Sequence, residues 1–158
     1  NRYSGEAIAL MGILLTCTGA SPNLTAVKFP DAQAASLGKI LVTADLLGQM
    51  SDRCYLEKLM FLFAELQEAG GNAYDSELAL LDKPIAFYAI VTRRFNADLG
   101  GVALYSQLHF RDRWSLDRDL YGEAMRRQVM YCGTILGKHR FEYRDCLRRF
   151  QYLKKAEN

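Results

Sequence analysis

One acidic side chain interrupts a strongly apolar stretch in the first third of the chain. Asp45 is the only charged residue between Lys39 and Asp52, and most of its neighbours are aliphatic. Their spacing is typical of a helix whose apolar surface is nearly continuous, so we expect this helix to be buried. An ionised carboxylate buried without a partner is strongly destabilising. Asp45 is therefore expected to meet a metal ion, an Arg, Lys or hydroxyl group from another helix, or a proton.

Two polar residues follow Asp45 at helical spacing. Gln49 lies one turn further on and Arg53 two turns further on, so both could face a ligand on the same side as Asp45. Arg53 could equally pair with Asp45 or with Glu57. The sequence contains no Gly-rich phosphate loop, no GxSxG motif and no HExxH motif. Motifs alone therefore identify no catalytic residue.

Helical periodicity recurs along the whole chain, and no β-like alternation persists. We predict an all-α fold, with residues 1–158 forming one multi-helix domain around one core. In the third predicted helix, Tyr55, Leu59, Leu62 and Leu66 form the inward stripe, and Glu57 lies on the solvent side. The predicted helices cover residues 4–16, 31–50, 53–69, 76–95, 116–136 and 141–154, with a break near Pro84 as the alternative for the fourth. We expect Gly70 and Gly71 to end the third helix and Ser115 to cap the fifth. In the last helix, the inward residues are expected to be Phe141, Leu147, Phe150 and Leu153.

Cysteine usage and hydropathy bear on location. The four cysteines, at positions 17, 54, 132 and 146, form no CxxC pair and are too sparse for a disulfide scaffold. The strongest apolar run, Ala7 to Leu15, has nine residues, whereas a membrane-spanning helix needs about 20. We therefore expect a cytoplasmic protein with free thiols and no membrane partner.

Charge is distributed unevenly between the two parts of the chain. Residues 1–110 carry 8 basic and 11 acidic side chains, and residues 111–158 carry 12 basic and 7 acidic ones. Aromatic residues interleave with the basic ones after Lys138, which is one feature of nucleic-acid binding. The net charge of +2 is nevertheless far from the strongly basic surface of such proteins. We interpret the basic run as a solvated helix face and expect no nucleic-acid partner.

A family resemblance lies in the segment from Leu37 to Leu59, which reads LGKILVTADLLGQMSDRCYLEKL. This segment resembles the later part of a bacterial group of HD-superfamily proteins, which are helical, metal-dependent phosphohydrolases. The similarity is densest over residues 38–68. It implies an HD-domain-like fold, a divalent metal ion as cofactor, and a small phosphorylated substrate such as a nucleotide or a related phosphoester. It also implies that Asp45 is the last of the metal ligands, with Gln49 and Arg53 facing the substrate or supporting a ligand.

The chain departs from the HD pattern in its histidines. No His-Asp dipeptide occurs, and the two histidines, His109 and His139, both follow Asp45. We interpret His109 as a packed or hydrogen-bonded residue and His139 as a solvated residue at a helix end. Either the upstream metal-binding half has been removed, which the start at Asn1 allows and which we favour, or the chain is a degenerate homologue. One carboxylate cannot hold a hydrolytic metal ion, so we expect this chain by itself to be catalytically inactive.

The alternative to an enzyme is a non-catalytic helical interaction or regulatory domain. Such a domain needs no active site, because its binding surface can be one exposed face of a helix. The two helices predicted over residues 116–136 and 141–154 could present such a face.

Overall fold

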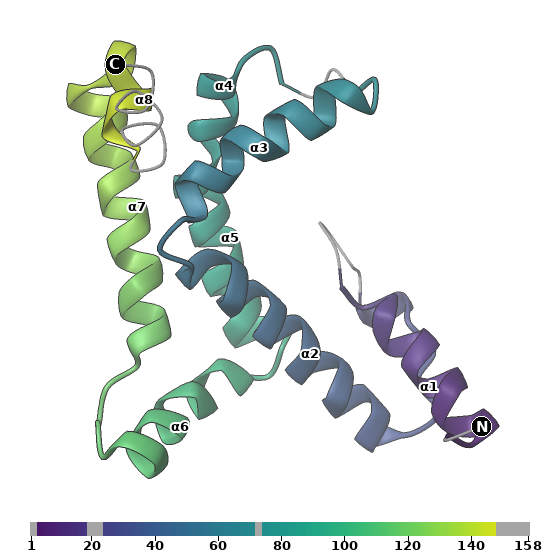
Figure 1. The fold of residues 1–158 in the computed structure, drawn as a ribbon. Coiled ribbons are helices and arrows are strands. Elements are labelled where there is room, and N and C mark those ends of the chain that lie inside the picture. The colour runs from purple at the N-terminus through teal and green to yellow at the C-terminus, as the bar shows by residue number, and fades with distance from the viewer. Residues whose placement is uncertain (1–2, 19–23, 72–73, 148–158) are drawn as a thin grey trace. The chain divides into compact units, whose positions relative to one another are not determined.

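The computed structural model describes residues 3–18, 24–71 and 74–147, and every regular element among them is a helix (Figure 1). The all-α prediction is therefore confirmed. Three short 3-10 turns, η1 to η3, cover Leu24–Ala26, Val102–Leu104 and Arg140–Glu142. The eight α-helices are α1 (Gly5–Leu15), α2 (Ala32–Ser51), α3 (Tyr55–Glu68), α4 (Glu77–Leu81), α5 (Lys83–Ala97), α6 (Tyr105–Trp114), α7 (Leu120–Lys138) and α8 (Tyr143–Cys146).

The chain divides into two compact units. Unit 1 comprises residues 1–48 and 91–120, and unit 2 comprises residues 49–90 and 121–158. Helices α2 and α5 each begin in one unit and end in the other. The assignment of residues 1–158 to one domain stays a prediction.

Three helices begin where side-chain oxygens can accept hydrogen bonds from the first turn. The Ser4 hydroxyl accepts a bond from the amide of Ala7, and the Ser76 hydroxyl does the same for Ala79. At α2 the Asp31 carboxylate accepts a bond from the amide of Ala34 at 2.7 Å. These contacts satisfy donors that a helix start leaves unpaired. The predicted starts of all three helices are confirmed.

Two helices end on residues with a left-handed backbone. Gly70 has φ 74°, and the amide of Gly71 donates to Leu66 O at 2.9 Å, which closes α3 as predicted. Ser115 has φ 53°, and its amide donates to Arg111 O. The expectation that Ser115 begins a helix at residue 116 was therefore wrong. It terminates α6 instead, and α7 begins at Leu120.

Unit 2 has a core built from residues far apart in the sequence. Its buried members come from α3, α4, α7 and the residue after α8: Leu56, Leu59, Met60, Leu80, Leu81, Cys132, Ile135 and Leu147. Figure 1 shows α8 folded back beside the C-terminal end of α7. Phe141 was predicted to point inward but is 97% exposed, because it lies in the turn η3 rather than within a continuous helix. The predicted inward positions Phe150 and Leu153 lie outside the described residues.

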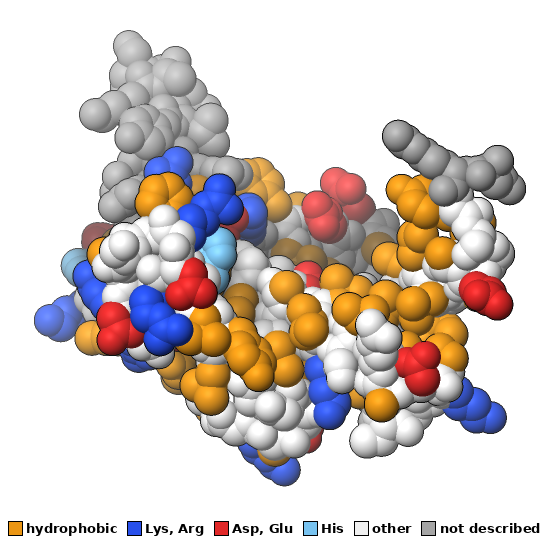
Figure 2. Space-filling model, turned by 90° about the horizontal axis from the view of Figure 1, so that it is seen from below, with side chains coloured by type: hydrophobic (Ala, Val, Ile, Leu, Met, Phe, Trp, Pro, Cys, Tyr) orange, Lys and Arg blue, Asp and Glu red, His pale blue; other side chains and the backbone are white. Residues whose placement is uncertain are grey.

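Helix α1 in unit 1 has a different character. None of its eleven residues, all of which the structure describes, is buried. Figure 2 shows several hydrophobic side chains at the surface on its right-hand side, where α1 lies. A groove of about 550 Å³ runs along α1 and is lined by Ala9, Gly12, Ile13, Thr16, Ala26, Val27 and Lys28. Apart from Lys28 and a threonine hydroxyl, this lining offers only apolar side chains and backbone.

Candidate functional site

A polar pocket in unit 2 is the best candidate site among the described residues. It has a volume of about 390 Å³, at the small end of the range for small-molecule pockets. Its lining comes from the end of α2, the turn before α3, the first turn of α3 and one face of α7: Ser51, Arg53, Glu57, Ala124, Arg127, Gln128 and Tyr131. Two guanidinium groups and one carboxylate therefore share the pocket with hydroxyl and amide groups.

Asp52 organises the turn that carries Arg53. One carboxylate oxygen of Asp52 accepts a hydrogen bond from the amide of Cys54 at 2.7 Å, and the other pairs with the Lys58 ammonium. The backbone carbonyl of Asp52 accepts a hydrogen bond from Gln128 Nε2 at 2.9 Å. The turn is thus fixed both to α3 and to α7, which restricts where Arg53 can place its guanidinium.

The α7 side of the pocket follows from helical spacing. Ala124, Arg127, Gln128 and Tyr131 are three or four residues apart, so they lie along one face of the helix. Gln128 ties this face to the turn, and the Tyr131 hydroxyl donates a hydrogen bond to the carbonyl of Cys146. Two contacts across long sequence separations therefore hold the pocket wall in place.

Glu57 corrects the sequence prediction for α3. The helical pattern assigned it to the solvent side, but it is only 5% exposed. The buried residues of α3 are Leu56, Glu57, Leu59 and Met60, whereas Leu62 of the predicted stripe is 41% exposed. Glu57 lines the same pocket as Arg127 and Gln128 of α7. A buried carboxylate beside two arginines has opposite charge within its own cavity, which offsets its loss of hydration.

The three residues singled out from the sequence have different surroundings. Asp45 belongs to unit 1 and is half-buried, next to the buried residues Leu46 and Leu47. Gln49 is exposed and lies outside the described lining of the pocket. Arg53 alone of the three lines the pocket. Helix α2 is also less buried than predicted, because Leu37 and Ile40 are exposed.

A hydrolytic metal centre that includes Asp45 would need further ligands. Such a centre normally uses about three protein ligands and a water molecule. Within the described part of the chain, no three His, Cys, Asp or Glu side chains form a group that could hold a metal ion. We therefore derive no catalytic step through a metal ion from these residues.

No family model, curated protein or solved structure matches this chain. The geometry of its own residues therefore carries the functional argument.

Sequence reasoning missed Glu57 and Arg127 as pocket residues. Arg127 belongs to an i, i+3, i+4, i+7 set on α7 that ends at Tyr131, a pattern that the sequence displays. The sequence does not show that this face of α7 shares a pocket with the first turn of α3. For Glu57, its place in the first turn of α3, just after the turn containing Asp52, was the available signal.

The histidines lie outside this pocket as the structure describes it. His109 on α6 is exposed, and its ring meets that of Phe110 edge to face at a centroid distance of 5.3 Å. His109 was expected to be packed or hydrogen-bonded; its ring contacts Phe110, but the residue is exposed. His139 follows the last residue of α7 and is exposed, as predicted for a helix-terminal residue.

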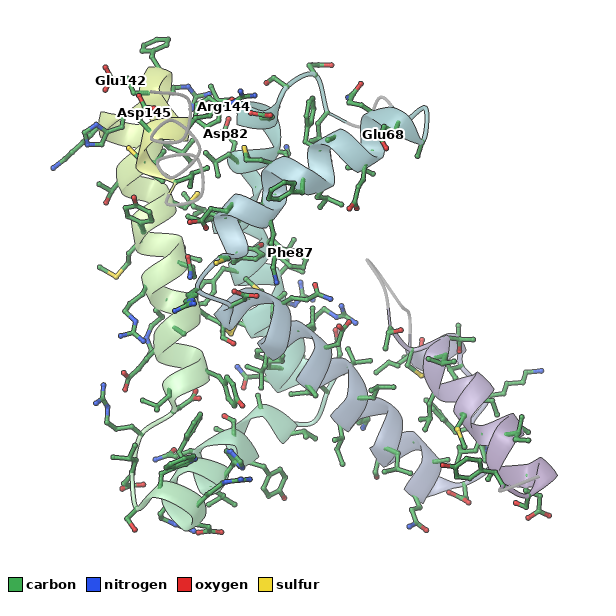
Figure 3. All side chains as sticks on the ribbon, viewed as in Figure 1. Glu68, Asp82, Phe87, Glu142, Arg144 and Asp145 are labelled. Atoms are coloured by element: carbon green, nitrogen blue, oxygen red, sulfur yellow. The ribbon has the colours of Figure 1, made fainter. Side chains whose placement is uncertain are left out.

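The basic residues after α7 form ion pairs with α4. Arg140 contacts the Asp82 carboxylate through two hydrogen bonds of 3.1 Å. Glu77 accepts hydrogen bonds from the Tyr143 hydroxyl at 2.6 Å and from Arg144 Nε at 2.8 Å. Figure 3 shows Asp82 and Arg144 close together at the end of unit 2 where α4 meets α8. Arg140 and Arg144 of the basic run are therefore paired with acidic side chains of unit 2.

All four cysteines are free thiols, and Cys132 is the most closely integrated into a core. Its thiol donates to Leu81 O at 3.2 Å. Burial, with a smaller contribution from the nearby charge of Asp82, raises the pKa of Cys132 to about 11. In the part of the chain that the structure describes, no helix combines the length and apolar character needed to cross a bilayer.

Proposed function

We propose that the pocket between α3 and α7 binds the phosphate group of a small phosphorylated ligand, as part of a cytoplasmic, metal-dependent phosphohydrolase. The observation that carries this proposal is the presence of Arg53 and Arg127 in one small pocket. A guanidinium presents a planar fork of donors that matches phosphate oxygens and stays charged at any physiological pH. The hydroxyl of Ser51 and the amide of Gln128 add uncharged donors to the same lining.

The hydrolase part of the proposal rests on the resemblance around Asp45. In that assignment Asp45 contributes one oxygen ligand to a divalent ion, and Arg53 contacts the substrate. When bound, such an ion would supply an activated water molecule for phosphoester hydrolysis. The chain's own residues bind and orient the phosphate. Arg53 supports both parts, because it lies in the segment of resemblance and also lines the pocket.

Equilibrium binding of methyl phosphate to the intact chain tests the pocket. We expect saturable binding that weakens about tenfold or more in Arg53→Gln and in Arg127→Gln, because each removes a charge-assisted hydrogen bond. Arg126→Gln is the matched control. It removes the same charge from the neighbouring exposed position of α7, outside the described lining. An equal loss in Arg126→Gln would show a general charge effect and refute a built site.

A separate assay tests the role assigned to Asp45. We expect no turnover of phosphoesters by the purified chain with added Mn²⁺, because one carboxylate is too few ligands for a catalytic ion. Metal-stimulated hydrolysis that disappears in Asp45→Ala would contradict the expected inactivity while supporting Asp45 as a ligand.

Exposed apolar side chains on unit 2 favour a second candidate, a non-catalytic interaction or regulatory domain. Phe141 is almost fully exposed, and Met130 on α7 is 73% exposed. Large apolar side chains at the surface occur at protein-binding sites. Under this alternative, methyl phosphate would bind wild type and Arg127→Gln equally weakly.

A further inference from the structure

The polar pocket contains an acidic group that phosphate binding alone does not explain. Glu57 is buried and lines the same cavity as Arg53 and Arg127. A carboxylate in an anion site weakens the binding of a bare phosphate, because like charges repel. Its presence therefore points to a ligand with more than a phosphate group.

A helix-capping role does not account for Glu57. It occupies the third position of α3, from which an acidic side chain can reach back to the amide at the helix start. That amide, on Cys54, already donates to the Asp52 carboxylate at 2.7 Å. The favourable effect of an acid near a helix start is also available to an exposed side chain and does not require burial.

We propose that Glu57 accepts hydrogen bonds from the hydroxyl groups of a phosphorylated sugar whose phosphate lies against Arg53 and Arg127. This inference rests on the proposed phosphate binding and narrows its ligand class. An ionised carboxylate has about four acceptor sites, so Glu57 can keep its contacts within the protein and still accept from a ligand. A pocket of about 390 Å³ suits a ligand of this small size.

The remaining lining agrees with a ligand of two chemical parts. The pocket has two positive groups and one negative group, so a phosphate held by the two arginines leaves the Glu57 carboxylate to contact the other part of the ligand. Hydroxyl groups fit this arrangement because each can donate to Glu57 and accept from Gln128 or Ser51.

Binding of three ligands to the full chain provides the test. We expect ribose 5-phosphate to bind about tenfold more tightly than methyl phosphate, since hydrogen bonds to a charged group contribute to affinity. Phosphoethanolamine presents an ammonium group in place of hydroxyls. Equal affinity for ribose 5-phosphate and methyl phosphate, or tighter binding of phosphoethanolamine than of the sugar, would overturn the inference without affecting phosphate binding itself. Failure of all three ligands to bind would instead refute the proposed function.

Substitution of Glu57 should change the affinities in opposite directions. In Glu57→Gln, methyl phosphate should bind more tightly because a repulsive charge is lost, whereas ribose 5-phosphate should lose its advantage. Glu65→Gln, at an exposed position of the same helix, is the matched control and should change neither affinity. Parallel changes for both ligands in Glu57→Gln would contradict a role in sugar selection. If Glu57→Gln does not fold, Glu57→Asp retains the charge and should still reduce the preference for the sugar.

Discussion

The polar pocket of unit 2 and the groove along α1 in unit 1 are cavities of comparable size with different construction. The pocket has about 390 Å³ and two arginines, a glutamate, a glutamine and two hydroxyl groups in its lining. The groove has about 550 Å³ and mainly small or aliphatic side chains. The pocket residues are fixed by contacts such as Gln128 to Asp52, which joins positions 76 residues apart. No residue of α1, a fully described helix, is buried. Volume alone therefore does not identify a site, whereas converging polar groups held by distant contacts do.

The largest expected difference between the two regions is in stability. Leu81→Ala removes a fully buried side chain from the core of unit 2, and we expect it to lower the free energy of unfolding by about 2–5 kcal/mol. Leu15→Ala on α1 removes a side chain that is 69% exposed and should cost less than about 0.5 kcal/mol. Urea unfolding followed by circular dichroism measures both. Equal losses would show that α1 is packed as firmly as the core of unit 2.

The core beside the pocket should also show a characteristic pH dependence. Cys132 has a pKa of about 11, above its ordinary value of 9.0, mainly because of burial. A raised pKa means that the folded state keeps the proton which the unfolded state has lost. The contribution of the protonated Cys132 thiol to the stability of the folded state is therefore complete below pH 9. This contribution is lost as the pH rises to about 11. Wild type should lose on the order of 2 kcal/mol more than Cys132→Ala over this interval. Parallel stability curves would contradict the burial of this thiol.

Ligand binding should separate the two cavities at their positive residues. Arg127→Gln should weaken methyl phosphate binding about tenfold or more. Lys28→Gln removes the positive charge that lines the groove of unit 1 and should leave the affinity within about twofold, since Lys28 is outside the described lining of the pocket and an exposed charge is largely screened by salt. Titration calorimetry at two salt concentrations measures both effects. A larger effect of Lys28→Gln would move the anion site to unit 1.

The smallest expected effect concerns the polar contacts between α4 and α8. Glu77→Gln weakens the bonds from Tyr143 and Arg144 to a carboxylate that is mostly buried. Because Arg144 is largely exposed, the cost should be about 1 kcal/mol. Glu65→Gln, on the exposed face of α3, should be neutral. Thermal unfolding of the two variants gives the difference, and a neutral Glu77→Gln would show that α8 is held by Leu147 and its apolar neighbours alone.

Local sequence signals predicted the helices well, because they depend on neighbouring residues. Ser4, Asp31 and Ser76 provide oxygens at helix starts, and Gly70 provides a left-handed stop. Ser115 was misread because its type suits a helix start, whereas the chain requires a left-handed residue after α6. Only tertiary context distinguishes these uses.

The candidate site was less predictable, because it depends on which helices meet. Arg53 was selected from the sequence, and the structure places it in the pocket. The helical period of α3 assigned Glu57 to the solvent side, but Glu57 is buried and lines the pocket together with residues of α7. The period of one helix does not show which other helix shares its pocket. In the sequence, Arg127 cannot be distinguished from an ordinary surface arginine on a helix. It lines the pocket in the structure, where the neighbouring Gln128 is hydrogen-bonded to the turn at Asp52.

The most direct test of the phosphate site is a magnetic-resonance titration of arginine side-chain Nε–Hε signals with methyl phosphate. The account predicts saturable shifts of the Arg53 and Arg127 signals with one shared dissociation constant, while the Arg126 signal stays unchanged. Unchanged signals from Arg53 and Arg127, or shifts of equal size at Arg126, would contradict a phosphate site between α3 and α7.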